Sequence, residues 1–278
     1  MKPFKKITII GVGLLGGSVG LAVKKYKLAD KVTGFFRNKN KIAAAVKMGA
    51  IDEGTDDIRK AVALSGLIIL CVPVSDIIKK LNILKKIAGK TSIITDTGST
   101  KLKIVKAAGR LNFIGSHPLA GSEQSGISGS RADLFKNSVL ILTPERCKRS
   151  KQLARLAEFW EKLGSKTVVM TPEKHDHMLA FSSHLPHAAA FSLMQALPNE
   201  AIDFTAGGLK DSTRIALSSP DIWADIFISN AKEVIRSIRA FEISLQTLKK
   251  AVAGHNKKEL VSFLKKSKDK RMLIPSGS

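Results

Sequence analysis

Cysteine is scarce in this chain of 278 residues. The two cysteines, Cys71 and Cys147, stand far apart, and neither belongs to a C-x-x-C pair. This pattern argues against a zinc ribbon and against a disulfide framework. Proteins without disulfides are typical of reducing compartments, so we expect a cytoplasmic protein without a metal site.

Acidic residues are also scarce. The sequence has 46 lysines and arginines against 23 aspartates and glutamates, which gives a formal net charge of +23. Such an excess suits nucleic acid, a membrane surface or acidic small molecules, but it also arises as a general property of a solvated surface. Because the basic residues are spread along the whole chain, we expect no nucleic-acid partner.

Long apolar runs are absent except near the start of the chain. Residues 1–6 are basic and residues 7–23 are largely apolar, a pattern that a secretory signal peptide also shows. The alternative is a short buried strand over 7–10, a glycine-rich turn, and a helix from about Leu14. No other run approaches the roughly 20 apolar residues that cross a bilayer, so we expect no membrane partner.

Three glycines favour the strand and the turn over the signal peptide, because they form G-x-G-x-x-G directly after the apolar run. In dinucleotide-binding proteins such glycines make a tight turn, let the backbone approach a pyrophosphate, and pack the helix on the strand. The free N–H groups at the start of the helix then point at the phosphates. The predicted cofactor contacts in this turn are Gly11, Gly13, Leu14, Leu15 and Gly16.

Short apolar runs alternate with helical patterns through the first half. The predicted strands cover residues 7–10, 32–36, 67–72, 92–95, 113–115 and 138–142, and the predicted helices cover about 14–27, 39–47, 56–63, 75–87 and 100–108. This alternation predicts an α/β domain over residues 1–166, a Rossmann-type doubly wound parallel sheet with helices on both faces. Ligands bind at the carboxyl ends of such strands, so Val72 and Pro73, which end one buried run, are further predicted cofactor contacts.

The sequence pattern changes in the second half of the chain. An amphipathic helix over 150–163 and a short strand over 167–170 are the last elements of the alternating pattern. Long helical patterns then fill residues 173–197, 221–252 and 256–268. We therefore predict an all-helical domain over residues 167–278.

The acidic residue that usually binds the ribose of NAD is missing where the second strand ends. Phe36 and Arg37 stand at that place, and no carboxylate follows before Asp52. A guanidinium pairs bidentately with phosphate, so Arg37 favours the 2′-phosphate of NADP. A solvated basic turn is the alternative, and NAD stays open as the cofactor.

Two histidine segments and one arginine are suited to chemistry on an anionic substrate. His117 follows a predicted strand on the ligand side of the sheet, where an imidazole can move a proton near neutral pH. His184 and His187 are three residues apart on a predicted helix, without a cysteine or carboxylate cluster that would complete a metal site. Arg214 follows a Gly–Gly turn and precedes an apolar run, so we expect it to be partly buried against a substrate carboxylate.

In this order and spacing, these segments resemble the prephenate and arogenate dehydrogenases of tyrosine biosynthesis over nearly the whole chain. The motifs that carry the resemblance are GVGLLGGS at 11–18, DTGSTK at 96–101, GSHPLAGSEQSG at 115–126, SHLPH at 183–187, and GGLKDSTRIA at 207–216 with Trp223 downstream. The resemblance implies a dinucleotide domain joined to a helical domain that forms a homodimer. It also implies an NAD(P)-dependent oxidative decarboxylation of a cyclohexadienyl substrate.

The resemblance further implies roles for individual residues. His117 would help to deprotonate the ring hydroxyl, and Ser99 would orient that hydroxyl and the imidazole. Arg214 would hold a substrate carboxylate, while His184 and His187 would line the pocket. We expect no added chorismate mutase or regulatory segment, and therefore a compact enzyme with a single activity.

The side chain of the substrate separates the two activities within this family. Arogenate carries an ammonium that would favour a nearby carboxylate, whereas His187 favours the keto acid of prephenate, so we predict prephenate dehydrogenase activity with arogenate as the alternative. A Rossmann dehydrogenase acting on 3-hydroxy acids is a second alternative, which substrate profiling would separate. A nucleic-acid-binding protein is a third, and it would show a steep salt dependence of DNA binding.

Overall fold

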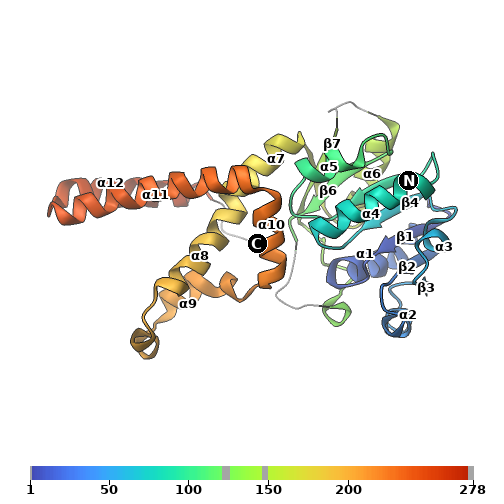
Figure 1. The fold of residues 1–278 in the computed structure, drawn as a ribbon, viewed down its shortest axis with the longest axis horizontal. Helices are drawn as coiled ribbons and strands as arrows, with labels where there is room; N and C mark the ends of the chain where they lie inside the picture. Colours follow the sequence, from blue (N-terminus) through green and yellow to red (C-terminus); the bar gives the residue numbers. More distant parts are fainter. Residues whose placement is uncertain (1, 121–125, 146–149, 275–278) are drawn as a thin grey trace. The chain divides into compact units, whose positions relative to one another are not determined.

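The computed structural model describes residues 2–120, 126–145 and 150–274 (Figure 1). The chain divides into two compact units, residues 1–231 and residues 232–278, and each is described by itself. All of the candidate site residues lie in the first unit.

A five-stranded parallel sheet forms the centre of the first unit. Its strands are β1 (Ile7–Ile10), β2 (Val32–Phe35), β3 (Glu53–Thr55), β4 (Leu67–Leu70) and β5 (Ile93–Asp96), in the order β3-β2-β1-β4-β5. Ile7 pairs with Val32 on one side and with Leu67 on the other. The strand order reverses between β1 and β4, which is the crevice where open α/β sheets bind ligands.

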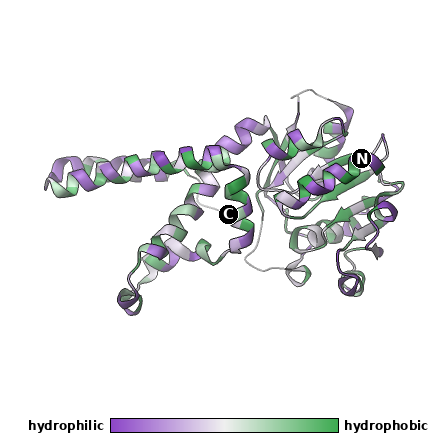
Figure 2. Cartoon of the chain, viewed as in Figure 1, coloured by the Kyte–Doolittle hydropathy of each residue, from purple (hydrophilic) through white to green (hydrophobic). Residues whose placement is uncertain are grey.

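The sheet is buried on both faces, which explains why its strands are continuous apolar runs rather than alternating ones. Ile9 and Ile69 face a core cluster formed with α1 (Leu14–Lys25) and α6 (Lys151–Lys162). Ile10 and Leu70 face a second cluster formed with α3 (Ile58–Val62), α4 (Val74–Ile87) and α5 (Leu102–Ala108). Figure 2 shows the strands of this sheet as hydrophobic ribbons, whereas the helices around them carry both colours. The predicted doubly wound parallel sheet is therefore confirmed.

The last predicted strands do not extend the parallel sheet, which corrects the expectation for residues 113–115 and 138–142. The strands β6 (Ile114–Pro118), β7 (Val139–Pro144) and β8 (Lys166–Val169) form a separate three-stranded sheet, in which β6 and β7 are antiparallel and β7 and β8 parallel. One parallel bridge, Ile94 to Phe113, joins β5 to the residue before β6. β6 therefore runs in the same direction as the central strands, and its carboxyl end lies at the same edge.

The start of the chain is part of the fold rather than a signal peptide, since β1 is the central strand and α1 packs on it. β3 was not predicted, because it is a three-residue edge strand with partly exposed residues and no apolar run. The remaining short elements of this half are η1 (Lys39–Lys41), α2 (Ile42–Lys47) and η2 (Ile127–Gly129).

The helical segments that follow are more broken than predicted. The expected helix over 173–197 is α7 (Pro172–Leu179), a π-helical turn η3 (Ala180–His184), and α8 (Leu185–Ala196). The expected helix over 221–252 is α10 (Pro220–Ser229) and α11 (Ala231–Ala253), which are separated at Asn230. Between α8 and α10 lie η4 (Asn199–Phe204), α9 (Gly207–Thr213) and η5 (Arg214–Leu217).

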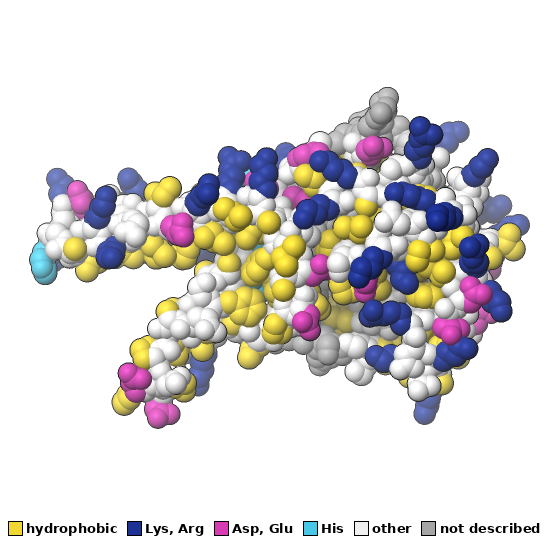
Figure 3. Space-filling view, in the orientation of Figure 1, with side chains coloured by type: hydrophobic (Ala, Val, Ile, Leu, Met, Phe, Trp, Pro, Cys, Tyr) yellow, Lys and Arg dark blue, Asp and Glu magenta, His cyan; other side chains and the backbone are white. Residues whose placement is uncertain are grey.

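The second unit consists of most of α11 and of α12 (Lys257–Met272), which Asn256 caps by accepting a hydrogen bond from the backbone N–H of Glu259. The exposed apolar side chains of α11 include Ile235, Phe241, Ile243, Leu245 and Val252. Among the described residues, none of the helices is both long enough and apolar enough to span a bilayer. Figure 3 shows lysine and arginine side chains scattered over the visible face rather than gathered in one patch.

Candidate active site

A cavity of about 670 Å³ opens where the carboxyl ends of β1, β2 and β4 meet. Gly11, Gly13, Arg37 and Val72, four of the predicted cofactor contacts, line this cavity. The other predicted contacts are not part of its lining. Leu14 and Leu15 pack against the core, Gly16 packs against the turn itself, and Pro73 precedes α4 as an exposed residue.

The glycine turn fits the pyrophosphate of a dinucleotide. A Cβ atom added at Gly13 would meet no atom within 4 Å, so the space above this residue is open. Gly13 is the N-cap of α1 and no side chain caps it, which leaves the helix N–H groups facing that space. A Cβ atom at Gly16 would lie 2.1 Å from the carbonyl oxygen of Gly11, so the helix can approach the strand only without one.

These two glycines predict different results for the same substitution. Gly13→Ala is expected to unfold at the temperature of the wild-type protein, because φ is −98° and the space is open. It is expected to bind the dinucleotide at least about tenfold more weakly, since its methyl group occupies the place of a phosphate. Gly16→Ala is expected to lose about 1–3 kcal/mol of stability through overpacking. Thermal unfolding and fluorescence titration with the dinucleotide check both variants, and wild-type dinucleotide affinity in Gly13→Ala would contradict this assignment.

The outer part of the cavity is basic. Arg37, Lys41, Lys79 and Lys80 line it, and Asp76 is the one carboxylate among the described lining residues. The Arg37 guanidinium lies 3.4 Å from an Asp76 carboxylate oxygen and remains largely exposed. Asp52, the first carboxylate after β2 in the sequence, accepts a hydrogen bond from the backbone N–H of Val32 at the opposite end of that strand.

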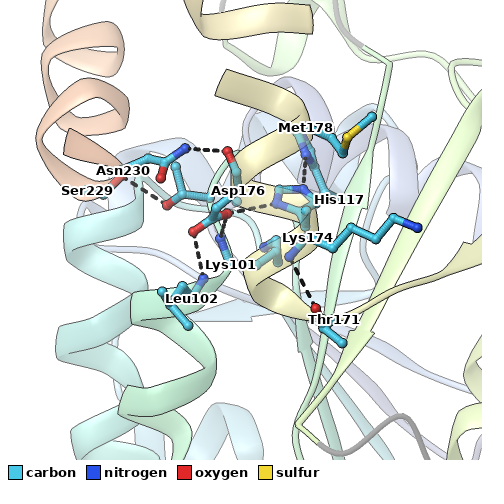
Figure 4. A network of polar contacts seen from close by, with 12 residues as sticks. Lys101, Leu102, His117, Thr171, Lys174, Asp176, Met178, Ser229 and Asn230 are labelled. Atoms are coloured by element: carbon cyan, nitrogen blue, oxygen red, sulfur yellow. Dashed lines mark hydrogen bonds and ion pairs between the residues drawn. The ribbon is translucent and has the colours of Figure 1, made fainter. Parts of the chain in front are cut away.

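His117, near the carboxyl end of β6, is the first member of a chain of buried polar groups (Figure 4). Its Nδ1 lies 2.8 Å from Nε2 of His175, and Nδ1 of His175 lies 2.8 Å from a carboxylate oxygen of Asp176. Burial lowers the pKa of His117 well below 6.5, and the positive charges of His175, Lys101 and His184 lower it further. His117 is therefore a neutral imidazole at physiological pH, as a proton acceptor must be.

Asp176 connects this chain to the DTGSTK segment. Its carboxylate accepts hydrogen bonds from the backbone N–H groups of Lys101, at 2.7 Å, and Leu102, at 2.9 Å, where α5 begins. The Lys101 side chain forms a fully buried ion pair with Asp96 at the end of β5. Burial raises the pKa of Asp96 and lowers that of Lys101, and the attraction between the two opposes both shifts.

His184 lies beside this network in the π-helical turn. The Asn230 side-chain amide donates to the backbone carbonyl of Asp176 at 2.8 Å and lies 3.3 Å from Nδ1 of His184. Burial lowers the pKa of His184 to about 4. Its Nε2 is buried and has no hydrogen-bond partner among the described residues, so a donor of this neutral ring is left for a ligand.

His187 lies one turn further along α8 and is half-buried. Its ring stacks on Trp223, with centroids 3.5 Å apart, and its Nδ1 lies 3.0 Å from the carbonyl oxygen of Ser183. Burial lowers the pKa of His187, and the positive charge of Arg214 lowers it further. His187, Trp223 and Arg214 are thus neighbours, although they come from three different helical elements.

Two predicted site residues differ from the expectation. Arg214 is exposed rather than partly buried, because at the end of α9 the inward position belongs to Thr213, whose hydroxyl donates to the carbonyl of Leu209. Ser99 is half-buried in the loop after β5, but it is not hydrogen-bonded to His117. The described partner of the His117 imidazole is His175 instead. No group of three or more potential metal ligands occurs among the described residues.

Comparisons with known proteins show which family this chain belongs to. Residues 19–170 match the family model described as prephenate dehydrogenase, nucleotide-binding domain, and residues 171–266 match the model described as prephenate dehydrogenase, dimerization domain. This chain belongs to the prephenate dehydrogenase family. It is an NAD(P)-dependent dehydrogenase with a nucleotide-binding domain followed by a helical dimerisation domain, so the resemblance, the fold class and the enzyme class predicted from the sequence are confirmed.

Its relatives in this family are similar over most of their length. The cyclohexadienyl dehydrogenase of Zymomonas mobilis is 34% identical over 99% of this chain and 97% of that protein, and the prephenate dehydrogenase of Bacillus subtilis is 32% identical over 97% of this chain and 76% of that protein. The prephenate dehydrogenase of Aquifex aeolicus, in a complex with hydroxyphenyl propionate and NAD+, has a TM-score of 0.90, 35% identity and 99% coverage of both chains.

Three polar residues of the site were not predicted from the sequence. His175 and Asp176 stand in the H-D-H segment at 175–177, and no role was predicted for them. The sequence signal that could have found them is the pair of adjacent proton-carrying side chains on a helix that follows the sheet. Asn230 gave no signal, because its role depends on contacts with α7 and η3, which are far away in the sequence.

Proposed function

We propose that this protein oxidises and decarboxylates prephenate to 4-hydroxyphenylpyruvate with NADP as the favoured hydride acceptor, with arogenate as the alternative substrate. The observation that carries the proposal is the buried neutral imidazole of His117, at the same sheet edge as the glycine turn, in a chain of this family. A bound nicotinamide supplies the hydride acceptor. The chain's own residues hold the substrate and move one proton.

His117 Nε2 accepts the proton of the ring hydroxyl, which makes the carbinol carbon a better hydride donor. General-base assistance of this kind is worth roughly 10²–10⁴ in rate. Loss of carbon dioxide makes the ring aromatic, and the same imidazole returns the proton to the ring oxygen. We assign Ser99 to orient the hydroxyl, and His184, His187 and Arg214 to hold the anionic part of the substrate. In support, Nε2 of His184 has no hydrogen-bond partner among the described residues, and Arg214 carries a positive charge at an exposed position.

The preference for NADP rests on the basic outer part of the cavity. Arg37 and Lys41 lie where β2 leads into α2, close to where the ribose of a dinucleotide held at Gly13 would lie. A 2′-phosphate would draw the Arg37 guanidinium away from Asp76, since charge-assisted contacts to phosphate are stronger than an exposed ion pair. The Aquifex relative was crystallised with NAD+, so this preference is proposed for this chain only.

Steady-state kinetics with both cofactors and both substrates test the proposal. We expect reduction of NADP with prephenate, at a kcat/KM higher than that with NAD or with arogenate. Arg37→Ala is expected to lower the efficiency with NADP about tenfold and to leave that with NAD nearly unchanged, because it removes one charge-assisted contact. Arg59→Ala, an exposed position on α3 outside the cavity, is the matched control. A wild-type preference for NAD would overturn the cofactor assignment, and absence of turnover with either substrate would overturn the function.

We propose that the protein acts as a homodimer through its helical part, with the division between the two domains near residue 166. The match of residues 171–266 to a dimerization-domain model and the exposed apolar side chains of α11 support this proposal. The cytoplasmic location expected from the cysteine content stays a prediction.

A further inference from the structure

The hydrogen-bond chain from Asp176 to His117 determines which nitrogen of each imidazole carries a proton. Both carboxylate oxygens of Asp176 already accept backbone N–H groups, so Asp176 is an acceptor toward His175 as well. His175 therefore donates from Nδ1. In a neutral ring this leaves Nε2 of His175 as an acceptor, so His117 must donate from its Nδ1 and keep a free lone pair on Nε2.

We propose that His175 and Asp176 are positioning residues that hold His117 in the tautomer with a free Nε2 and share the proton that His117 accepts. This inference rests on the proposed function. When the substrate O–H bond breaks, an N–H bond forms at Nε2 of His117. The proton on Nδ1 of His117 can then pass to Nε2 of His175, and it returns by the same route when the ring oxygen is protonated. The enzyme exchanges no net proton with the solvent over one catalytic cycle. A hydrogen-bond network without access to water can therefore carry out the transfer.

The surroundings favour this sharing. The side chain of His175 is fully buried, and its ring lies at a tilt to that of His117 with centroids 5.0 Å apart. A positive charge on His175 lies next to the Asp176 carboxylate, whereas a positive charge on His117 faces His175, Lys101 and His184. Burial lowers the pKa of His175 below its usual value; the hydrogen bond to the Asp176 carboxylate opposes that shift, and the charge of Lys101 adds to it. Asp96 also faces this ring and raises its pKa.

Two substitutions at one position separate positioning from packing. His175→Gln places an amide oxygen near the former Nε2, so it can still accept from His117 Nδ1, whereas His175→Leu removes the acceptor with a similar volume. We expect His175→Leu to lower kcat by about 10²-fold or more with little change in KM, as other misplaced catalytic tautomers do. We expect His175→Gln to recover at least about tenfold of that loss. His177→Gln, on the same helix with its ring against Phe181, controls for a histidine change in α7.

The pH profile provides a readout that packing alone would not move. Two imidazoles that share one proton hold it more tightly than a single imidazole does, so in His175→Gln the acid limb of kcat/KM is expected to move to lower pH. A kcat for His175→Leu within about threefold of wild type, or equal kcat and unshifted pH profiles in both variants, would overturn the proposal.

Nitrogen-15 NMR of the wild-type protein labelled at histidine tests the same idea without activity or a variant. The expected state is a neutral His117 with hydrogen on Nδ1 and none on Nε2, and hydrogen on Nε2 would overturn the proposal. Since this spectrum does not depend on turnover, it distinguishes a failure of the positioning network from a failure of the proposed function.

Discussion

His117→Asn is expected to lower kcat by roughly 10²–10⁴-fold while dinucleotide binding stays within about twofold of wild type. An asparagine amide can lie near the former Nδ1 and still donate to His175, so the buried network keeps its partner. What the variant lacks is a basic nitrogen at the position of Nε2. The loss corresponds to about 3–5.5 kcal/mol of transition-state stabilisation.

Single-turnover kinetics with prephenate and fluorescence titration with the dinucleotide measure these two quantities separately. In the wild-type protein, kcat/KM should be constant through neutral pH and fall only in the acid range, because burial holds the pKa of His117 well below 6.5. That limb should disappear in His117→Asn. Turnover of the variant at the wild-type rate would show that another group accepts the proton.

Lys101→Met is expected to lower the free energy of unfolding by about 3–5 kcal/mol, the largest stability effect that we predict. Both members of the Asp96–Lys101 pair are completely buried, so removing the ammonium leaves a carboxylate without its counter-charge. Asp96 keeps the backbone N–H groups of Gly98 and Ser116, which compensate only part of that charge. Urea unfolding of the variant and the wild type at one protein concentration measures the difference.

The double variant Asp96→Asn/Lys101→Met is the internal control for this effect. It removes both charges, so it should be more stable than Lys101→Met alone, since neutral replacement of a buried pair is often tolerated. Lys106→Met, at an exposed position on α5, should change stability by less than about 0.5 kcal/mol. Equal unfolding midpoints for Lys101→Met and Lys106→Met would contradict the buried pair.

The parts of the fold that local signals determine could be predicted from the sequence. The strand before Gly11, the glycine turn and α1 follow from an apolar run and three spaced glycines, and the structure has them at the expected residues. β3 was not predicted, because a three-residue edge strand buries too little surface to require an apolar pattern. The antiparallel pairing of β6 with β7 was not predicted, because the direction of a strand depends on the chain segment that connects it to its neighbour. An apolar run contains no information about that segment.

The residues of the site, too, could be predicted only where a local signal marks them. His117 could be found because it ends a strand at the ligand edge, and Gly13 because it belongs to a spaced motif. The pairing of His117 with His175 does not follow from the sequence, since the contact between β6 and α7 joins residues 58 positions apart. The helix break at Asn230 has the same origin, because its side chain binds the backbone of α7 and its own backbone leaves the helix there.

A crystal structure of this protein with NADP and hydroxyphenyl propionate tests the central claim most directly. We expect the ring hydroxyl of the ligand within about 2.6–3.2 Å of His117 Nε2. We also expect Nδ1 of His117 to be hydrogen-bonded to His175 and the pyrophosphate to lie over Gly13. A ligand hydroxyl bound away from His117, or a His117 ring turned so that Nε2 faces His175, would contradict it.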